Sequence, residues 1–241
     1  MAASRVQALL MGGQACVFYG AAEFSRDTDL LILASPDNLQ KLSHALRELR
    51  AECIAVPPFE LSYLQRGHAI HFRCHHPDAA GMRVDVMSVL RGVDPFLELW
   101  VRRTTLTDAD GTSYDLLSLS DLVRAKKTQR SKDWPMLQRL IEAHYLKHRH
   151  APEPALLRFW MRELRTPELL LEVTQSNSDL TRELSSERPL LTLAAERQTD
   201  ELNTALAEEE GLERERDRIY WRPLKAELEK LRHEQFKKGA E

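Results

Sequence analysis

Several features are scarce in this chain of 241 residues, and each scarcity narrows the classes of protein to which it can belong. Its three cysteines, Cys16, Cys53 and Cys74, are odd in number and show no paired spacing, so a reducing cytoplasm fits best. No apolar run approaches the length of a membrane span, and the start of the chain lacks the pattern of a secretory signal, so we expect no membrane association. With 34 Lys and Arg against 37 Asp and Glu, the chain has no overall attraction to nucleic acid. This balance does not exclude a basic patch on part of the surface.

The rest of the composition is that of a globular protein, with 43% hydrophobic and 29% charged residues. No internal repeat is visible. The segment Ala151-Pro152-Glu153-Pro154 marks a plausible boundary, so we expect one domain over 1–150 and a helical, strongly charged region over 151–241. Leu224, Leu228 and Leu231 form an apolar stripe in that region, but the sustained heptads of a coiled coil are missing.

The most informative stretch runs from Leu10 to Leu33 and places a Gly12-Gly13 pair ahead of two aspartates, Asp27 and Asp29. On a strand these aspartates, at i and i+2, point to the same face, and the apolar run Leu30 to Leu33 is typical of a strand buried on both faces. Paired carboxylates repel each other unless a cation lies between them, and oxygen ligands favour a hard ion such as Mg²⁺.

The glycine pair is expected to serve a phosphate. Glycine has no side chain to block the approach of a phosphate to the backbone N–H groups. We expect a strand ending near Met11 and a short helix over 14–24, whose positive N-terminal end favours an anion. Arg26 either pairs with a phosphate or balances the carboxylates.

This pattern resembles the signature of the polymerase-β-like nucleotidyltransferase superfamily, in which a Gly-Gly or Gly-Ser pair precedes an Asp-x-Asp or Asp-x-Glu. The wider string GGQACVFYGAAEFSRDTDLLIL is similar to the AbiEii-type and related small bacterial nucleotidyltransferases. The residue between the aspartates is usually apolar in the family and is Thr28 here. The resemblance covers about the first 150 residues and implies a mixed α/β fold: a nucleotidyltransferase-type mixed sheet flanked by helices, with a helical C-terminal extension.

The resemblance also implies a third carboxylate on a strand next to the Asp-x-Asp. The segment Arg83 to Val89 alternates in polarity and predicts a strand with Asp85 on the face opposite Val84 and Val86. A carboxylate within an apolar strand is costly unless it has a partner. Asp85 is therefore the candidate that completes a metal-binding triad with Asp27 and Asp29, which would hold Mg²⁺, or Mn²⁺ as an alternative.

A second informative stretch, Ser118 to His148, predicts two helices, the second beginning at Asp133. Lys126 and Arg130 are expected on one face of the first helix, at i and i+4. The stretch resembles the AbiEii-type pattern of Lys, then Arg, then an Asp that opens the next helix. The family's further acidic residue is missing here, which limits any role of Asp133 beyond capping. Lys126 (or Lys127) and Arg130 either clamp a triphosphate or form a solvated basic face.

Together the resemblance implies a Mg²⁺-dependent nucleotidyltransferase that moves a nucleoside monophosphate from an NTP such as ATP to an acceptor hydroxyl of RNA, a protein or a small molecule. Similar proteins include toxins that modify RNA, so a toxin with a protein antitoxin as partner is one role. Two alternatives stay open: a catalytically silent nucleotide-binding or regulatory module on the same fold, and a zinc-binding interaction protein built on residues 68–76. The zinc alternative is the weaker, because His68 and His71 would face opposite sides of a strand.

Overall fold

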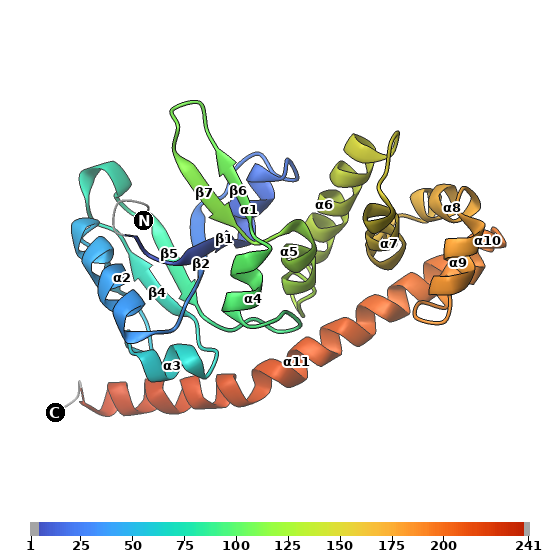
Figure 1. The fold of residues 1–241 in the computed structure, drawn as a ribbon. Helices are drawn as coiled ribbons and strands as arrows, with labels where there is room; N and C mark the ends of the chain where they lie inside the picture. Colours follow the sequence, from blue (N-terminus) through green and yellow to red (C-terminus); the bar gives the residue numbers. More distant parts are fainter. Residues whose placement is uncertain (1–4, 239–241) are drawn as a thin grey trace. The chain divides into compact units, whose positions relative to one another are not determined.

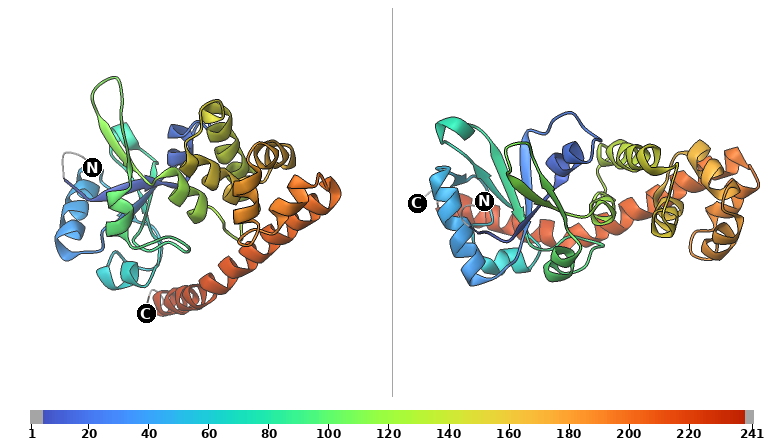
Figure 2. Two further views of the ribbon diagram at one scale, coloured as in Figure 1. Left: turned by 45° about the vertical axis from the view of Figure 1, so that its right-hand side comes forward. Right: turned by 45° about the horizontal axis from the view of Figure 1, so that its top comes forward.

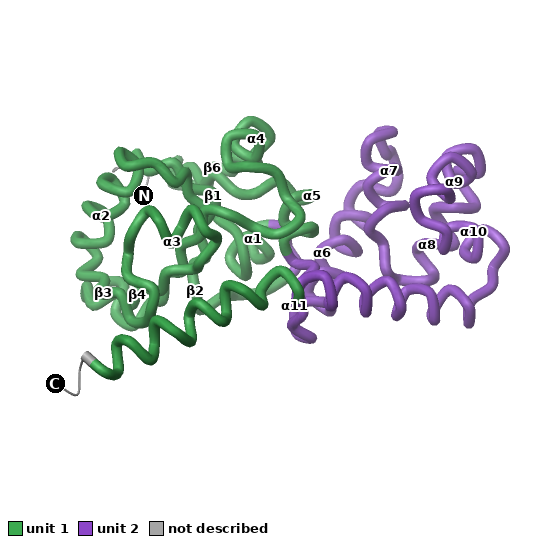
Figure 3. The backbone as a smooth tube through the Cα atoms, turned by 90° about the horizontal axis from the view of Figure 1, so that it is seen from below, with its two compact units in different colours: residues 1–18, 22–125, 219–241 green, residues 19–21, 126–218 purple. Residues whose placement is uncertain are grey.

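The computed structural model describes residues 5–238, which form two compact units. Residues 5–18, 22–125 and 219–238 belong to unit 1, and residues 19–21 and 126–218 to unit 2 (Figure 3). The predicted domain boundary after residue 150 lies within unit 2. It stays a prediction, because compact units defined by contacts need not coincide with domains.

The described residues of unit 1 form a seven-stranded sheet in the order β3-β4-β5-β2-β1-β7-β6 (Figure 1). The β2–β5 and β1–β7 pairs are parallel and the other pairs are antiparallel, so the sheet is mixed, as the resemblance implied. The β6–β7 hairpin, green in Figures 1 and 2, extends beyond the neighbouring strands. The strands are β1 (Ala8–Met11), β2 (Asp27–Ile32), β3 (Glu52–Cys53), β4 (Ile70–Arg73), β5 (Arg83–Met87), β6 (Thr104–Thr107) and β7 (Ser113–Leu116).

Unit 1 also contains short helices that follow local signals in the sequence. Helix α2 begins at Pro36, because the Ser35 hydroxyl accepts a hydrogen bond from the Asn38 N–H and Pro36 occupies the first turn. Helix α1 differs from the predicted 14–24: it begins at Gly12 and ends at Phe18, just before Gly20, whose φ of +78° is typical of a helix stop. The helices are α1 (Gly12–Phe18), α2 (Pro36–Glu48), α3 (Leu61–Gln65), η1 (Pro77–Ala79), α4 (Phe96–Val101) and α5 (Leu119–Ala125).

One hydrophobic core cluster of unit 1 lies on one face of the sheet. Strands β2, β4 and β5 contribute alternate residues to it, and helices α2 and α3 cover them with leucines. Val84 and Val86 are buried while Asp85 between them is not, which confirms the predicted alternation of β5. The buried residues of this core are Leu30, Ile32, Leu42, Leu46, Leu64, Ile70, Phe72, Cys74, Val84 and Val86.

Unit 2 is helical. It contains α6 (Asp133–His148), α7 (Pro154–Glu163), α8 (Pro167–Gln175), α9 (Ser178–Leu184) and α10 (Leu190–Ala195). The last helix, α11 (Thr199–Lys238), contributes its residues up to 218 to unit 2 and its later residues to unit 1.

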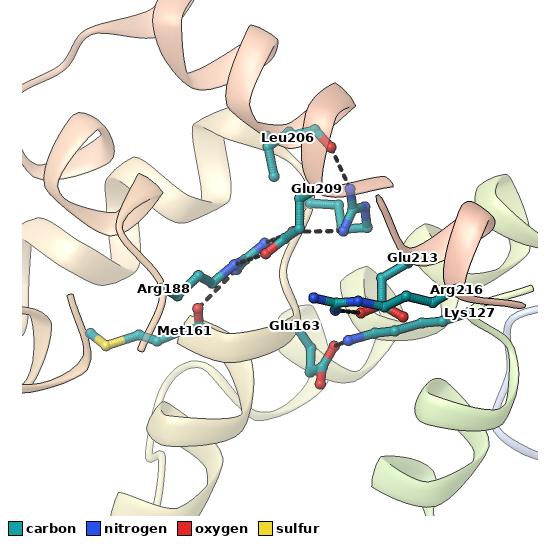
Figure 4. A network of polar contacts seen from close by, with 9 residues as sticks. Lys127, Met161, Glu163, Arg188, Leu206, Glu209, Glu213 and Arg216 are labelled. Carbon is teal, nitrogen blue, oxygen red and sulfur yellow. Dashed lines mark hydrogen bonds and ion pairs between the residues drawn. The ribbon is translucent and has the colours of Figure 1, made fainter. Parts of the chain in front are cut away.

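A polar network ties α11 to the other helices of unit 2 (Figure 4). Glu209 accepts two hydrogen bonds from Arg188, at 2.9 and 2.8 Å, and one from Arg165 at 2.8 Å. Both arginines are nearly buried, and their remaining contacts include the carbonyl oxygens of Met161 and Leu206. One carboxylate thus serves two buried guanidinium groups, an arrangement in which loss of the carboxylate is costly.

The later part of α11 packs within unit 1. Leu224 of the predicted apolar stripe is buried, and Glu227 lies 2.9 Å from Arg66 and 2.8 Å from the buried His68. Among residues 5–238, no helix combines the length and apolar character that crossing a membrane requires.

Candidate functional site

The register of the sheet brings the three predicted carboxylates to one place. Strands β2 and β5 are parallel neighbours, with Asp29 directly opposite Asp85 and Asp27 opposite Arg83. Residues that oppose each other share a face, and neighbouring strands lie about 4.8 Å apart. Asp27, Asp29 and Asp85 therefore lie on one face of adjacent strands, opposite the face that carries the core residues Val84 and Val86. The predicted position of Asp85 beside the Asp-x-Asp strand is confirmed.

The Gly12-Gly13 pair begins α1 directly after β1 and lies against this face. Gly12 has a φ of +63°, and a Cβ atom there would lie 1.8 Å from Asp29 Oδ2. A Cβ atom on Gly13 would lie 2.5 Å from Ser25 Oγ. Only glycine at position 12 fits both the left-handed backbone and the adjacent carboxylate. The pair thus lets the chain turn closely beside Asp29, and its binding of phosphate stays a prediction.

Asp85 has two cationic or polar neighbours that sequence reasoning did not identify as its partners. His71 is directly opposite Asp85 in the antiparallel β4–β5 pair, and its Nδ1 lies 2.8 Å from Asp85 Oδ1. Arg83 donates from Nε to the same oxygen at 2.8 Å. Burial raises the pKa of Asp85, but the hydrogen bonds from His71 and Arg83 outweigh that effect, so the pKa lies below its ordinary value. Asp85 is therefore ionised at neutral pH.

The alternation of polar and apolar residues in His71-Phe72-Arg73 and in Arg83-Val84-Asp85 could have indicated this cluster. If β4 and β5 had been paired in the correct register, His71, Arg83 and Asp85 would have fallen on one face. A single sequence does not supply that register. The missing signal was therefore the strand pairing rather than any residue type.

The residues suit a hard divalent cation in kind, because three carboxylates lie on one face of two neighbouring strands. Within residues 5–238, however, no three His, Cys, Asp or Glu side chains are grouped closely enough to hold a metal ion. At Asp85, the Oδ1 atom is in contact with His71 and Arg83.

The predicted basic residues are distributed between the two units. Arg26 is exposed in the loop before β2 in unit 1. Lys126 and Arg130 belong to unit 2, where Arg130 Nε lies 2.7 Å and Lys126 Nζ 3.7 Å from Asp133, a nearly buried residue at the start of α6. Their phosphate-binding role stays a prediction.

The expected helix through Lys126 and Arg130 is wrong, because α5 ends at Ala125. The following residues are held by side-chain hydrogen bonds instead of helical ones. Thr128 donates its hydroxyl to Asp133 at 2.5 Å, and the Trp134 indole N–H donates to the Thr128 carbonyl at 2.8 Å. Local bonds of this kind satisfy hydrogen-bonding groups of the backbone without a further helical turn.

The histidines of the weak zinc alternative have separate partners. His68 is fully buried and contacts Glu227, whereas His71 contacts Asp85. Cys74 belongs to the hydrophobic core, where burial raises the pKa of its thiol. All three cysteines of the chain are free thiols.

No protein-family model matches this chain, and no curated protein matches it.

Proposed function

We propose that the chain is a Mg²⁺-dependent nucleotidyltransferase with a nucleotidyltransferase-type fold in unit 1. It would move a nucleoside monophosphate from an NTP to an acceptor hydroxyl and release pyrophosphate. The observation that carries the proposal is the register of Asp29 opposite Asp85, with Asp27 on the same face. Gly12, close against Asp29, adds a turn of the kind that the motif pairs with these aspartates.

Asp27, Asp29 and Asp85 would hold the divalent cation, which when bound stabilises the charge on the attacking and leaving oxygens. Asp85 would also orient the acceptor hydroxyl and accept its proton at a carboxylate oxygen. Its lowered pKa keeps the carboxylate ionised, as binding of a cation requires. Gly12 and Gly13 would let the triphosphate approach the backbone closely, and Arg26 would neutralise part of its charge.

The acceptor would be RNA, a protein hydroxyl or a small molecule. A toxin that modifies RNA, controlled by a protein antitoxin in the cytoplasm, is one role consistent with this chemistry. The near balance of charges over the whole chain favours none of these acceptors.

The proposal is tested by incubating the chain with Mg²⁺, one α-labelled NTP at a time, and total RNA or cell extract. We expect label on an acceptor with the unmodified chain and none with Asp27→Ala or Asp85→Ala. Asp37→Ala is the matched control, because Asp37 is an exposed aspartate on α2. Undiminished transfer by both site variants would remove the triad from the reaction.

A second candidate function is a nucleotide-binding or regulatory module without turnover. One observation favours it: Asp85 Oδ1 is already in contact with His71 and Arg83. Nucleotide binding that persists with no transfer to RNA, protein or small-molecule acceptors would support this second function.

A further inference from the structure

His71 contacts a predicted metal ligand, and the role inferred for it rests on the proposed function. We propose that His71 is a positioning residue for Asp85. Through its Nδ1 atom it fixes the orientation of the Asp85 carboxylate and leaves the second oxygen, Oδ2, to bind the divalent cation. His71 itself would contact neither the cation nor the substrate.

The sheet places His71 correctly for this task. His71 and Asp85 oppose each other on β4 and β5, so their side chains leave the same face of the sheet. Both side chains are partly covered, with exposed fractions of 27% and 16%. A contact of 2.8 Å between two directly opposed, partly covered groups restricts the carboxylate far more than an exposed pair would.

The oxygen that is contacted decides the orientation. His71 Nδ1 and Arg83 Nε both lie 2.8 Å from Asp85 Oδ1, and neither of these contacts involves Oδ2. A carboxylate that was merely neutralised could be bonded through both oxygens, as Glu209 is by Arg188. At Asp85 the two donors converge on one oxygen, which is the arrangement expected when the other is kept for a ligand.

The donor and acceptor roles follow from the same geometry. An ionised carboxylate only accepts, so Nδ1 of His71 carries the proton and donates it to Oδ1. Arg83 Nη2 lies 3.1 Å from the same Nδ1, but a protonated Nδ1 cannot accept from it. Arg83 therefore acts on Asp85 through Nε, and the orientation depends on a donor at the Nδ1 position.

That dependence allows a discriminating pair of substitutions. The side-chain amide of asparagine can place an N–H near the position of Nδ1, whereas that of glutamine reaches the position of Nε2. His71→Asn should therefore preserve the contact with Asp85, and His71→Gln and His71→Leu should lose it. His44→Leu is the control, because His44 is an exposed histidine on α2.

The test measures binding of Mn²⁺ alone to the full chain, by loss of the free-ion signal in electron paramagnetic resonance. Removing a residue that orients a metal ligand typically costs about 10- to 100-fold in metal affinity. We expect His71→Leu and His71→Gln to weaken Mn²⁺ binding by at least about 10-fold. The Mn²⁺ affinity of His71→Asn should stay within about 3-fold of that of the unmodified chain, and His44→Leu should leave the affinity unchanged. Thermal unfolding of each variant checks that the fold persists. If His71→Leu does not fold, the comparison of His71→Asn with His71→Gln decides.

The possible failures are separable. In one outcome, the double variant Asp27→Ala, Asp29→Ala loses Mn²⁺ binding, but His71→Leu and His71→Gln bind Mn²⁺ as tightly as the unmodified chain or more tightly. His71 would then compete with the cation or play no part in binding it, and only the inference about His71 would be overturned. If the unmodified chain binds no Mn²⁺, or if the binding ignores Asp27 and Asp29, the metal site of the proposed function fails and the role of His71 fails with it.

Discussion

Replacing Gly12 with alanine should displace Asp29 and so damage the carboxylate site. Gly12 has a φ of +63°, and an L-residue in that region costs about 1–2 kcal/mol. The added Cβ atom would also lie 1.8 Å from Asp29 Oδ2, whereas contacting atoms are normally about 3.5–4.0 Å apart. Asp29 must therefore move by an ångström or more, and a displacement of about 1 Å in a reacting group costs on the order of 100-fold in rate.

Gly81→Ala is the matched control. Gly81 has a φ of +78° and lies in the same unit, but a Cβ atom added there would meet no atom within 4 Å. Both variants carry the same kind of backbone strain, but Gly12→Ala should lose more free energy of unfolding in urea, because only it adds an overlap with Asp29. Only Gly12→Ala should also lose nucleotide transfer and Mn²⁺ affinity. Equal transfer by the two variants would refute the close packing of Gly12 on Asp29.

Two further predictions concern stability. Glu209→Gln should lower the free energy of unfolding by roughly 3 kcal/mol, because it leaves two nearly buried arginines without their carboxylate. Glu183→Gln, in an exposed pair with arginine, should change the same urea titration far less. At Asp121, burial raises the pKa, but hydrogen bonds from Arg102 and Ser118 outweigh it and lower the pKa. Its contribution to stability is therefore complete above the unfolded-state pKa and is lost as the pH falls through the lower folded-state pKa. The stability gap between the unmodified chain and Asp121→Asn should be full at neutral pH and shrink in acid; a gap that grows in acid would contradict the assignment.

Local signals in the sequence predicted much of unit 1. The alternation in β5 and the apolar run of β2 each depend on side chains that are close in sequence, and each is present in the structure. The grouping of Asp85 with Asp27 and Asp29 on one face came from a resemblance. The structure shows the β2–β5 register that brings the three residues together.

The features that were not predicted depend on contacts distant in sequence. The pairing of His71 with Asp85 requires the β4–β5 register, and the burial of His68 requires Glu227, which lies far along the chain. The helix expected through Lys126 and Arg130 ends early because Thr128 bonds to Asp133 and the Gln129 N–H to Asp217. Periodicity and propensity carry no information on such partners.

The central claim is nucleotidyl transfer at the carboxylates of β2 and β5, and the position of the transferred label tests it most directly. The chain would be given Mg²⁺, an acceptor mixture, and the same NTP labelled either in the α- or in the γ-phosphate. The account predicts α-label on the acceptor and γ-label in released pyrophosphate, both lost in the Asp27→Ala, Asp29→Ala variant. Label from the γ-phosphate on the acceptor, or α-label transfer that survives loss of both aspartates, would contradict it.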